Sequence, residues 1–209
     1  MKITHLMINS PKISSQKKRY QIIGEFALEF VESLIISLGI FLIVYNFFVQ
    51  TRTVLNVSMQ PNFYEGDRII TDIFSYRLRE PKRGEVIVLD SPLHESEEYL
   101  KRVIGLPGEE ILIENNTVTI FNDVHPYGFI LHEDYLGKFV TTNGGNVVKE
   151  GVKTKILEDS YLVMGDNRDR SSDSRLWGML PKKDIVARVL FRYWPVIRIE
   201  AFAAVDYGE

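Results

Sequence analysis

The pattern of hydrophobic and polar positions changes near residue 50, and this change divides the chain into two parts. Residues 33–49 read SLIISLGIFLIVYNFFV and contain no charged residue. Extended back to Phe26, the run is long enough as a helix to cross the roughly 30 Å hydrocarbon core of a bilayer. The pattern therefore predicts a transmembrane helix over residues 26–50, preceded by a segment of residues 1–25 and followed by a separate domain.

Two other structures can produce an apolar run near an N-terminus. A buried core helix is rarely apolar on all its faces. A cleavable signal peptide also begins with basic residues, but this run is long for one and no convincing Ala-x-Ala-like site follows it. These criteria favour a retained membrane anchor.

Basic residues lie mainly on one side of the predicted helix. Only Arg52 follows it before Asp67, whereas the basic residues Lys12, Lys17, Lys18 and Arg19 all precede it. Lys and Arg are enriched on the cytoplasmic side of membrane helices. We therefore expect a single-pass protein of the cell membrane, with a cytoplasmic N-terminus and an extracytoplasmic domain.

Beyond residue 50, short β-rich runs alternate with turn signals. The predicted strands are Arg68–Asp72, Glu85–Leu89, Tyr99–Ile104, Ile111–Ile113, Val118–Phe121, Ser160–Met164 and Ile185–Tyr193. This spacing predicts a mainly β domain over residues 51–209, an antiparallel β-sandwich or barrel. A more polar, Gly-rich stretch at about residues 115–155 predicts an inserted lobe.

Composition narrows the possible chemistry. The formal net charge of −3 argues against a dedicated nucleic-acid binder. The chain has no cysteine, and its histidines (His5, His94, His125 and His132) form no HxxxH or HxH pair. Disulfides and thiolate metal sites are therefore excluded, and we expect no metal or organic cofactor.

A serine and a lysine remain as candidates for chemistry. Ser58 follows the apolar run closely and has no histidine near it in the sequence. A serine hydroxyl becomes a good nucleophile when a neighbouring base accepts its proton, and a lysine can be that base only if desolvation keeps it neutral. Alternation along Tyr99–Ile104 places Lys101 on one face with Tyr99 and Val103.

Both residues also have simpler interpretations. Lys101 could face solvent on an edge strand, because buried lysines are rare. Ser58 could belong to a strand-to-turn transition in which Pro61 fixes the bend. These residues alone indicate only a possible Ser/Lys site.

Three segments taken together resemble the bacterial type I signal peptidases. They are SMQP at residues 58–61, YLKRVIGLPGE at 99–109 and GDNRDRSSDSRLWG at 165–178. Their order and spacing follow the family from about residue 34 to the C-terminus. The resemblance implies a membrane-anchored serine endopeptidase that removes signal peptides, on the β fold that signal peptidases share with self-cleaving repressors.

The resemblance also implies roles for individual residues. Ser58 corresponds to the nucleophile and Lys101 to the general base. The supporting residues would be Asn56 as second oxyanion donor, Ser171 orienting the lysine amine, Gly165 allowing close approach, and Asp166, Arg168, Asp173 and Arg175 bracing the loop. Met59, Pro61 and Tyr99 would contact the substrate, whose small residues at −1 and −3 fit shallow apolar pockets.

Two positions depart from the usual pattern of the family. Val57 stands where a proline or glycine is usual, and Asn62 where a threonine is usual. Both leave the dyad positions intact and bear on fine specificity. The implied partners are the lipid bilayer and signal peptides emerging from the translocation channel. Four aromatic residues would touch the bilayer surface unless they belong to the core: Phe63, Tyr64, Phe74 and Tyr76.

Two rival functions use the same residues differently. A Ser/Lys self-cleaving peptidase of the repressor type predicts a DNA-binding helical module where this chain has its apolar run. A non-catalytic, membrane-anchored β-domain that binds exported proteins would keep the motifs only as a scaffold. Loss of Ser58 or Lys101 would mark that second case, and both are present.

Overall fold

The computed structural model describes residues 15–94 and 96–207. The chain divides into an N-terminal unit that ends at Phe47 and a β-rich unit that begins at Phe48. Residues 1–14, which make up much of the predicted cytoplasmic segment and include Lys12, lie outside the described residues, as do the side chains of Lys17 and Lys18.

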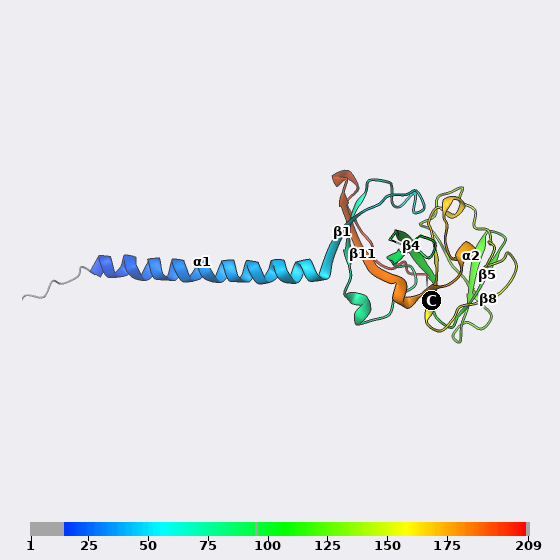
Figure 1. The fold of residues 1–209 in the computed structure, drawn as a ribbon, viewed down its shortest axis with the longest axis horizontal. Coiled ribbons are helices and arrows are strands. Elements are labelled where there is room, and N and C mark those ends of the chain that lie inside the picture. Colours follow the sequence, from blue (N-terminus) through cyan, green and yellow to red (C-terminus); the bar gives the residue numbers. More distant parts are fainter. Residues whose placement is uncertain (1–14, 95, 208–209) are drawn as a thin grey trace, which may run out of the picture. The chain divides into compact units, whose positions relative to one another are not determined.

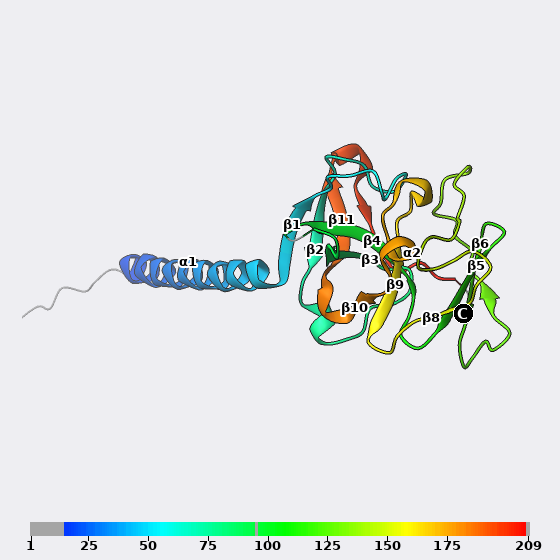
Figure 2. The same cartoon turned by 45° about the vertical axis from the view of Figure 1, so that its right-hand side comes forward.

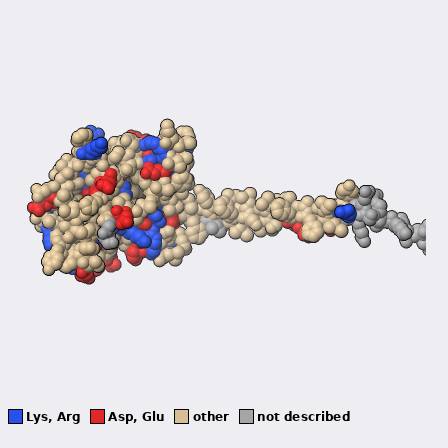
Figure 3. Space-filling model, turned by 180° about the vertical axis from the view of Figure 1, so that it is seen from behind, with Lys and Arg blue, Asp and Glu red and all other residues tan. Residues whose placement is uncertain are grey.

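The described part of the N-terminal unit is one helix, α1 (Ser15–Phe48), whose last residue already belongs to the β-rich unit. Its segment Ile22–Ile43 is long and apolar enough to cross a membrane, and none of that apolar stretch is buried within the protein. Among the described side chains of α1, Figure 3 shows acidic and basic residues only in the part of the helix nearer Ser15. A helix with this exposed apolar surface does not fit the interpretation as a soluble core helix. The helix ends at Phe48, so Val49 and Gln50, which we expected in the anchor, begin strand β1 (Val49–Thr53) instead.

The β-rich unit is built around one curled antiparallel sheet (Figure 1). Its strands lie in the order β1-β2-β11-β3-β4-β9-β10, with β12 paired to β11. Their bounds are β2 (Arg68–Asp72), β3 (Val86–Asp90), β4 (Glu98–Gly105), β9 (Ser160–Met164), β10 (Leu180–Pro181), β11 (Ile185–Trp194) and β12 (Glu200–Ala201). The prediction of a mainly β, antiparallel domain is confirmed.

A second antiparallel sheet has the order β7-β6-β5-β8. Its strands are β5 (Glu110–Glu114), β6 (Thr117–Phe121), β7 (Phe129–Ile130) and β8 (Thr154–Lys155). Figure 2 shows this small sheet on the opposite side of the β-rich unit from β1 and β11. It occupies the region of the predicted inserted lobe, although β5 begins earlier, at Glu110.

Short helices complete the unit: η1 (Ser75–Arg77), η2 (Arg168–Arg170), α2 (Ser174–Trp177), η3 (Lys182–Asp184) and η4 (Val196–Arg198). One apolar cluster of the large sheet includes Met59, Phe63 and Leu100. Because Phe63 is fully buried there, it belongs to the core and not to a bilayer-facing surface. Tyr64 is 39% exposed, and Phe74 packs edge-on against Phe48 with ring centroids 4.6 Å apart.

Strand β4 lies inside the large sheet, between β3 and β9. All its residues from Leu100 to Gly105 are buried, on both faces, so the alternation expected for a half-exposed strand is absent. Lys101 belongs to this buried run and is only 2% exposed, so it does not face solvent. The fold therefore places this lysine inside the protein.

Candidate active site

Ser58 and Lys101 meet although they are 43 residues apart in the sequence. The Lys101 Nζ donates a hydrogen bond to Ser58 Oγ at 2.9 Å and another to the Leu100 carbonyl oxygen at 3.0 Å. The Lys101 side chain is only 2% exposed and Ser58 only 5% exposed. The two groups therefore form a buried pair within proton-transfer distance.

Burial changes the acid–base character of this lysine. It lowers the pKa of Lys101 from its ordinary value of 10.5 to about 8, against the opposing influence of the Asp173 and Asp166 carboxylates. The physical cause is the loss of water around the ammonium form. A lysine with this pKa is neutral in roughly a tenth of the molecules at pH 7, whereas an exposed lysine is almost entirely protonated there.

Asn56 contacts the nucleophile in a different way from the one we expected. Its Oδ1 accepts hydrogen bonds from Ser58 Oγ at 2.7 Å and from the Ser58 backbone N–H at 3.2 Å. The amide therefore turns its oxygen, and not its NH₂ group, toward Ser58. Donation to an oxyanion requires the amide to rotate, which would also free the Ser58 N–H for the same oxyanion.

Gly165 lies where the third motif packs tightly against the nucleophile. A Cβ at this position would lie 2.4 Å from the Ser58 carbonyl oxygen and 2.3 Å from Ser171 Oγ, which leaves no room for a side chain. Ser171 is buried, and its hydroxyl has no hydrogen-bond partner among the residues that the structure describes. The predicted bond from Ser171 to the lysine amine is thus not formed in this structure.

Asp173 organises the chain behind Gly165. It accepts from the Gly165 N–H at 3.1 Å and from Arg175 Nε at 2.8 Å, in an ion pair that is almost fully buried. It also caps the N-terminus of α2 by accepting from the Arg175 N–H. Arg175 in turn donates to the Arg168 carbonyl oxygen at 2.6 Å. These bonds fix the backbone of the third motif.

A second buried ion pair lies directly beside the lysine. Arg102, the neighbour of Lys101, donates to Asp166 at 2.9 and 2.7 Å, and its guanidinium lies 4.1 Å from the centre of the Tyr135 ring. Asn62 donates to Asp166 at 2.8 Å and to the Tyr135 carbonyl oxygen at 2.9 Å. The departure at position 62 therefore has a structural use, because it ties the nucleophile segment to Asp166.

Two further residues hold the site, and our sequence interpretation had assigned no role to either. The Asn167 N–H donates to the Ser58 carbonyl oxygen at 2.9 Å, and Asn167 Nδ2 donates to the Val57 carbonyl oxygen at 3.1 Å. Glu133 forms a buried ion pair with Arg168. Asn167 lies inside the third motif and could have been included, whereas nothing in the sequence around Glu133 indicates its partner.

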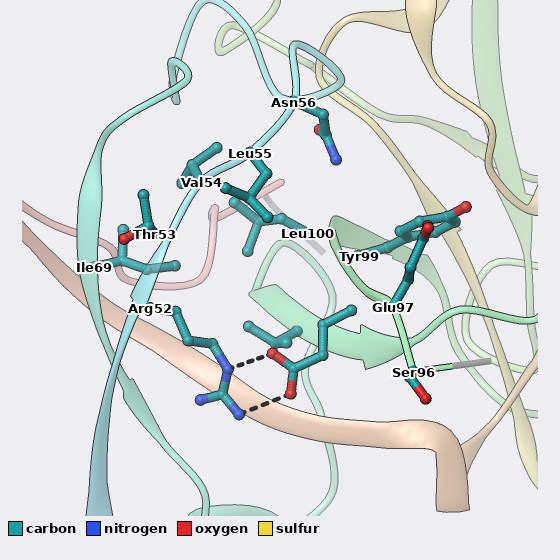
Figure 4. A pocket seen from close by; sticks show the side chains of 12 residues that line it. Arg52, Thr53, Val54, Leu55, Asn56, Ile69, Ser96, Glu97, Tyr99 and Leu100 are labelled. Atoms are coloured by element: carbon teal, nitrogen blue, oxygen red, sulfur yellow. Dashed lines mark hydrogen bonds and ion pairs between the residues drawn. The ribbon is translucent and has the colours of Figure 1, made fainter. Parts of the chain in front are cut away.

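A groove of about 690 Å³ extends from the site between two chain segments. Residues 52–56 line one side and residues 96–100 the other, with Ile69 and Val88 also contributing. Figure 4 shows Arg52 at one end and Asn56 at the other, with Leu55, Leu100 and Tyr99 between them. Of the three predicted substrate contacts, Tyr99 lines this groove, Met59 is buried in the core, and Pro61 is exposed outside it.

The family model described as "Signal peptidase, peptidase S26" matches residues 27–194. A probable signal peptidase I-2 of Synechocystis sp. is 33% identical over 84% of this chain and 75% of its own length. Signal peptidase IB of Staphylococcus aureus is 31% identical over 80% of this chain and 90% of its own length. A crystal structure of a signal peptidase I from Enterococcus faecalis V583 is 28% identical, covers 53% of this chain and 97% of its own, and superposes with a TM-score of 0.42.

Proposed function

Because this chain belongs to the signal peptidase (peptidase S26) family, we propose that it removes signal peptides from exported preproteins with Ser58 as nucleophile and Lys101 as general base. The single observation that carries the residue assignment is the buried hydrogen bond between Lys101 Nζ and Ser58 Oγ at 2.9 Å. A protein that kept its motifs only as a scaffold would need neither this contact nor a lysine with a lowered pKa.

In the proposed reaction, the Ser58 hydroxyl turns from Asn56 toward the neutral Lys101 amine. Ser58 Oγ attacks the scissile carbonyl carbon while its proton passes to Lys101 Nζ. The tetrahedral oxyanion accepts from the Ser58 N–H and from the rotated Asn56 amide. When the C–N bond breaks, Lys101 gives the proton to the departing amine. Water, deprotonated by Lys101, then hydrolyses the acyl-enzyme ester and restores Ser58.

The groove offers backbone edges to an extended substrate. β1 is the outermost strand at one end of the large sheet, and residues 98–101 of β4 pair only with β3, because pairing with β9 begins at Arg102. An extended signal-peptide segment could hydrogen-bond to these edges as an added strand. Its side chains at −1 and −3 would point into the groove toward Leu100 and Val54.

The membrane is part of the proposal. The family and the apolar helix α1 indicate a membrane-anchored protein. We place the N-terminus in the cytoplasm and the β-rich unit outside, because basic residues precede the helix. Preproteins leaving the translocation channel would then be tethered to the same bilayer, which raises their effective concentration at the site.

The test is cleavage of a preprotein by full-length protein in detergent. Wild type should release the mature protein, whereas Ser58→Ala and Lys101→Ala should lower kcat by several orders of magnitude. Ser91→Ala and Lys183→Ala change a serine and a lysine outside the site and serve as matched controls. Full activity in either dyad variant, or no cleavage by wild type, would refute the assignment.

A further inference from the structure

An ion pair closes the end of the groove that lies away from the dyad. Arg52 Nε donates to Glu98 Oε2 at 2.7 Å, and Arg52 Nη2 donates to Glu98 Oε1 at 3.0 Å (dashed lines in Figure 4). Strands β1 and β4, which carry these residues, are separated in the sheet by β2, β11 and β3. The pair therefore bridges two strands that the curl of the sheet brings face to face.

A residue of strand β2 holds the arginine of this ion pair in place. Arg52 also donates to the Thr71 hydroxyl, and Thr71 is fully buried on β2. The Arg52 side chain is 15% exposed, against 41% for Glu98. A bidentate guanidinium–carboxylate pair that is anchored at one partner has a defined geometry, unlike a pair of free surface charges. The groove thus has a fixed wall at this end.

The two strand segments run in the same direction along the groove. Arg52 and Glu98 meet at one end, and Ser58 and Lys101 meet at the other. From Lys101 back to Glu98 there are three strand residues, which span roughly 10 Å at about 3.3 Å each. Consider an extended peptide whose scissile carbonyl lies at Ser58. The residue that reaches the ion pair is then the third or the fourth before the cleaved bond, −3 or −4. Because side chains alternate along an extended strand, only residue −3 points to the same side as residue −1.

We propose that the Arg52–Glu98 ion pair is the specificity determinant that restricts the −3 residue of the substrate to a small side chain. This inference rests on the proposed function. The two side chains, bridged across the groove, occupy the space that a larger −3 side chain would need. A small residue fits in front of the pair, and a leucine or phenylalanine collides with it.

The experiment measures kcat/KM of the full-length enzyme in detergent for one preprotein that carries Ala, Val, Leu or Phe at −3. Wild type should prefer Ala over Leu by roughly tenfold or more, the usual effect of unaccommodated methylene groups. Arg52→Ala/Glu98→Ala should lower that ratio about tenfold. The charge-swapped Arg52→Glu/Glu98→Arg should restore much of it. The control Glu80→Ala/Lys182→Ala removes an ion pair outside the groove and should keep the wild-type ratio.

Glu98→Ala alone provides a second measurement, because it changes one partly exposed side chain and leaves Arg52 bonded to Thr71. Its unpaired guanidinium should make a preprotein with Asp at −3 a better substrate than it is for wild type. The inference is overturned if wild type cleaves in a Ser58-dependent manner but Arg52→Ala/Glu98→Ala and Glu98→Ala both keep the wild-type −3 preference. Absence of Ser58-dependent cleavage would instead refute the proposed function.

Discussion

The Lys101 amine and the Ser58 hydroxyl lie 2.9 Å apart inside the β-rich unit, and no histidine takes part in this contact. The pairing depends on burial in two ways. Burial removes the water that would keep Lys101 protonated, and burial also holds both side chains in fixed positions. The carboxylates of Asp173 and Asp166 moderate the effect by favouring the ammonium form.

The activity should depend on pH through Lys101. Only the neutral amine can accept the Ser58 proton, and the pKa of Lys101 in the folded protein is about 8. We expect kcat/KM to rise with an apparent pKa near that value and to fall about tenfold per pH unit well below it. Lys183→Ala should show the same profile as wild type. A profile flat between pH 9 and 5 would contradict a lysine base.

Replacing Lys101 by methionine should abolish cleavage but stabilise the fold. The pKa of Lys101 falls from 10.5 to about 8 on folding, so the unfolded chain binds more protons between these values. Wild-type stability therefore rises with pH through that window. Below pH 8 burial of the ammonium costs roughly 3 kcal/mol, which Lys101→Met avoids. Urea unfolding should show the variant more stable at pH 7, with the difference largely gone above pH 10.5.

Two substitutions at Asn56 separate its possible roles. Asn56→Ala removes both the acceptor seen in the structure and the proposed oxyanion donor, and should lower kcat by roughly 100- to 1,000-fold. Asn56→Asp keeps the acceptor for the Ser58 N–H and loses the donor. We expect it to be at least as inactive as the alanine variant, with little change in KM. An active Asn56→Asp enzyme would limit Asn56 to a structural role.

Gly165→Ala should damage the site even though it adds a single methyl group. The new Cβ would lie within 2.4 Å of the Ser58 carbonyl oxygen and 2.3 Å of Ser171 Oγ, so the nucleophile segment must shift. Overpacking of this kind typically costs about 1–3 kcal/mol, and a displaced Ser58 lowers kcat further. Gly137→Ala is the control, because its new Cβ meets only side-chain atoms, Val140 Cγ2 at 3.3 Å and Pro61 Cδ at 4.0 Å. Wild-type kcat in Gly165→Ala would show that the close approach is not required.

Much of the fold follows from local patterns. The strands Arg68–Asp72 and Ser160–Met164 were predicted with the bounds that the structure gives them, because each is a short β-rich run between turn signals. The short strands β7, β8, β10 and β12 were missed, since two residues carry no periodicity. Strand β1 was missed because the predicted anchor covers Val49 and Gln50, and the three polar residues that follow, TRT, do not by themselves indicate a strand.

The sequence by itself determined which residues are available for chemistry: one serine after an apolar helix, one lysine in a strand, and no cysteine or paired histidine. It left open whether Lys101 faces solvent or the interior. Only the tertiary structure decided this, because burial depends on where β4 lies in the sheet. The same holds for the Arg102–Asp166, Arg168–Glu133 and Arg52–Glu98 pairs. In each pair the two residues come from segments that are distant in the sequence. The curl of the sheet and the packing of loops bring these opposite charges together, and local propensity does not.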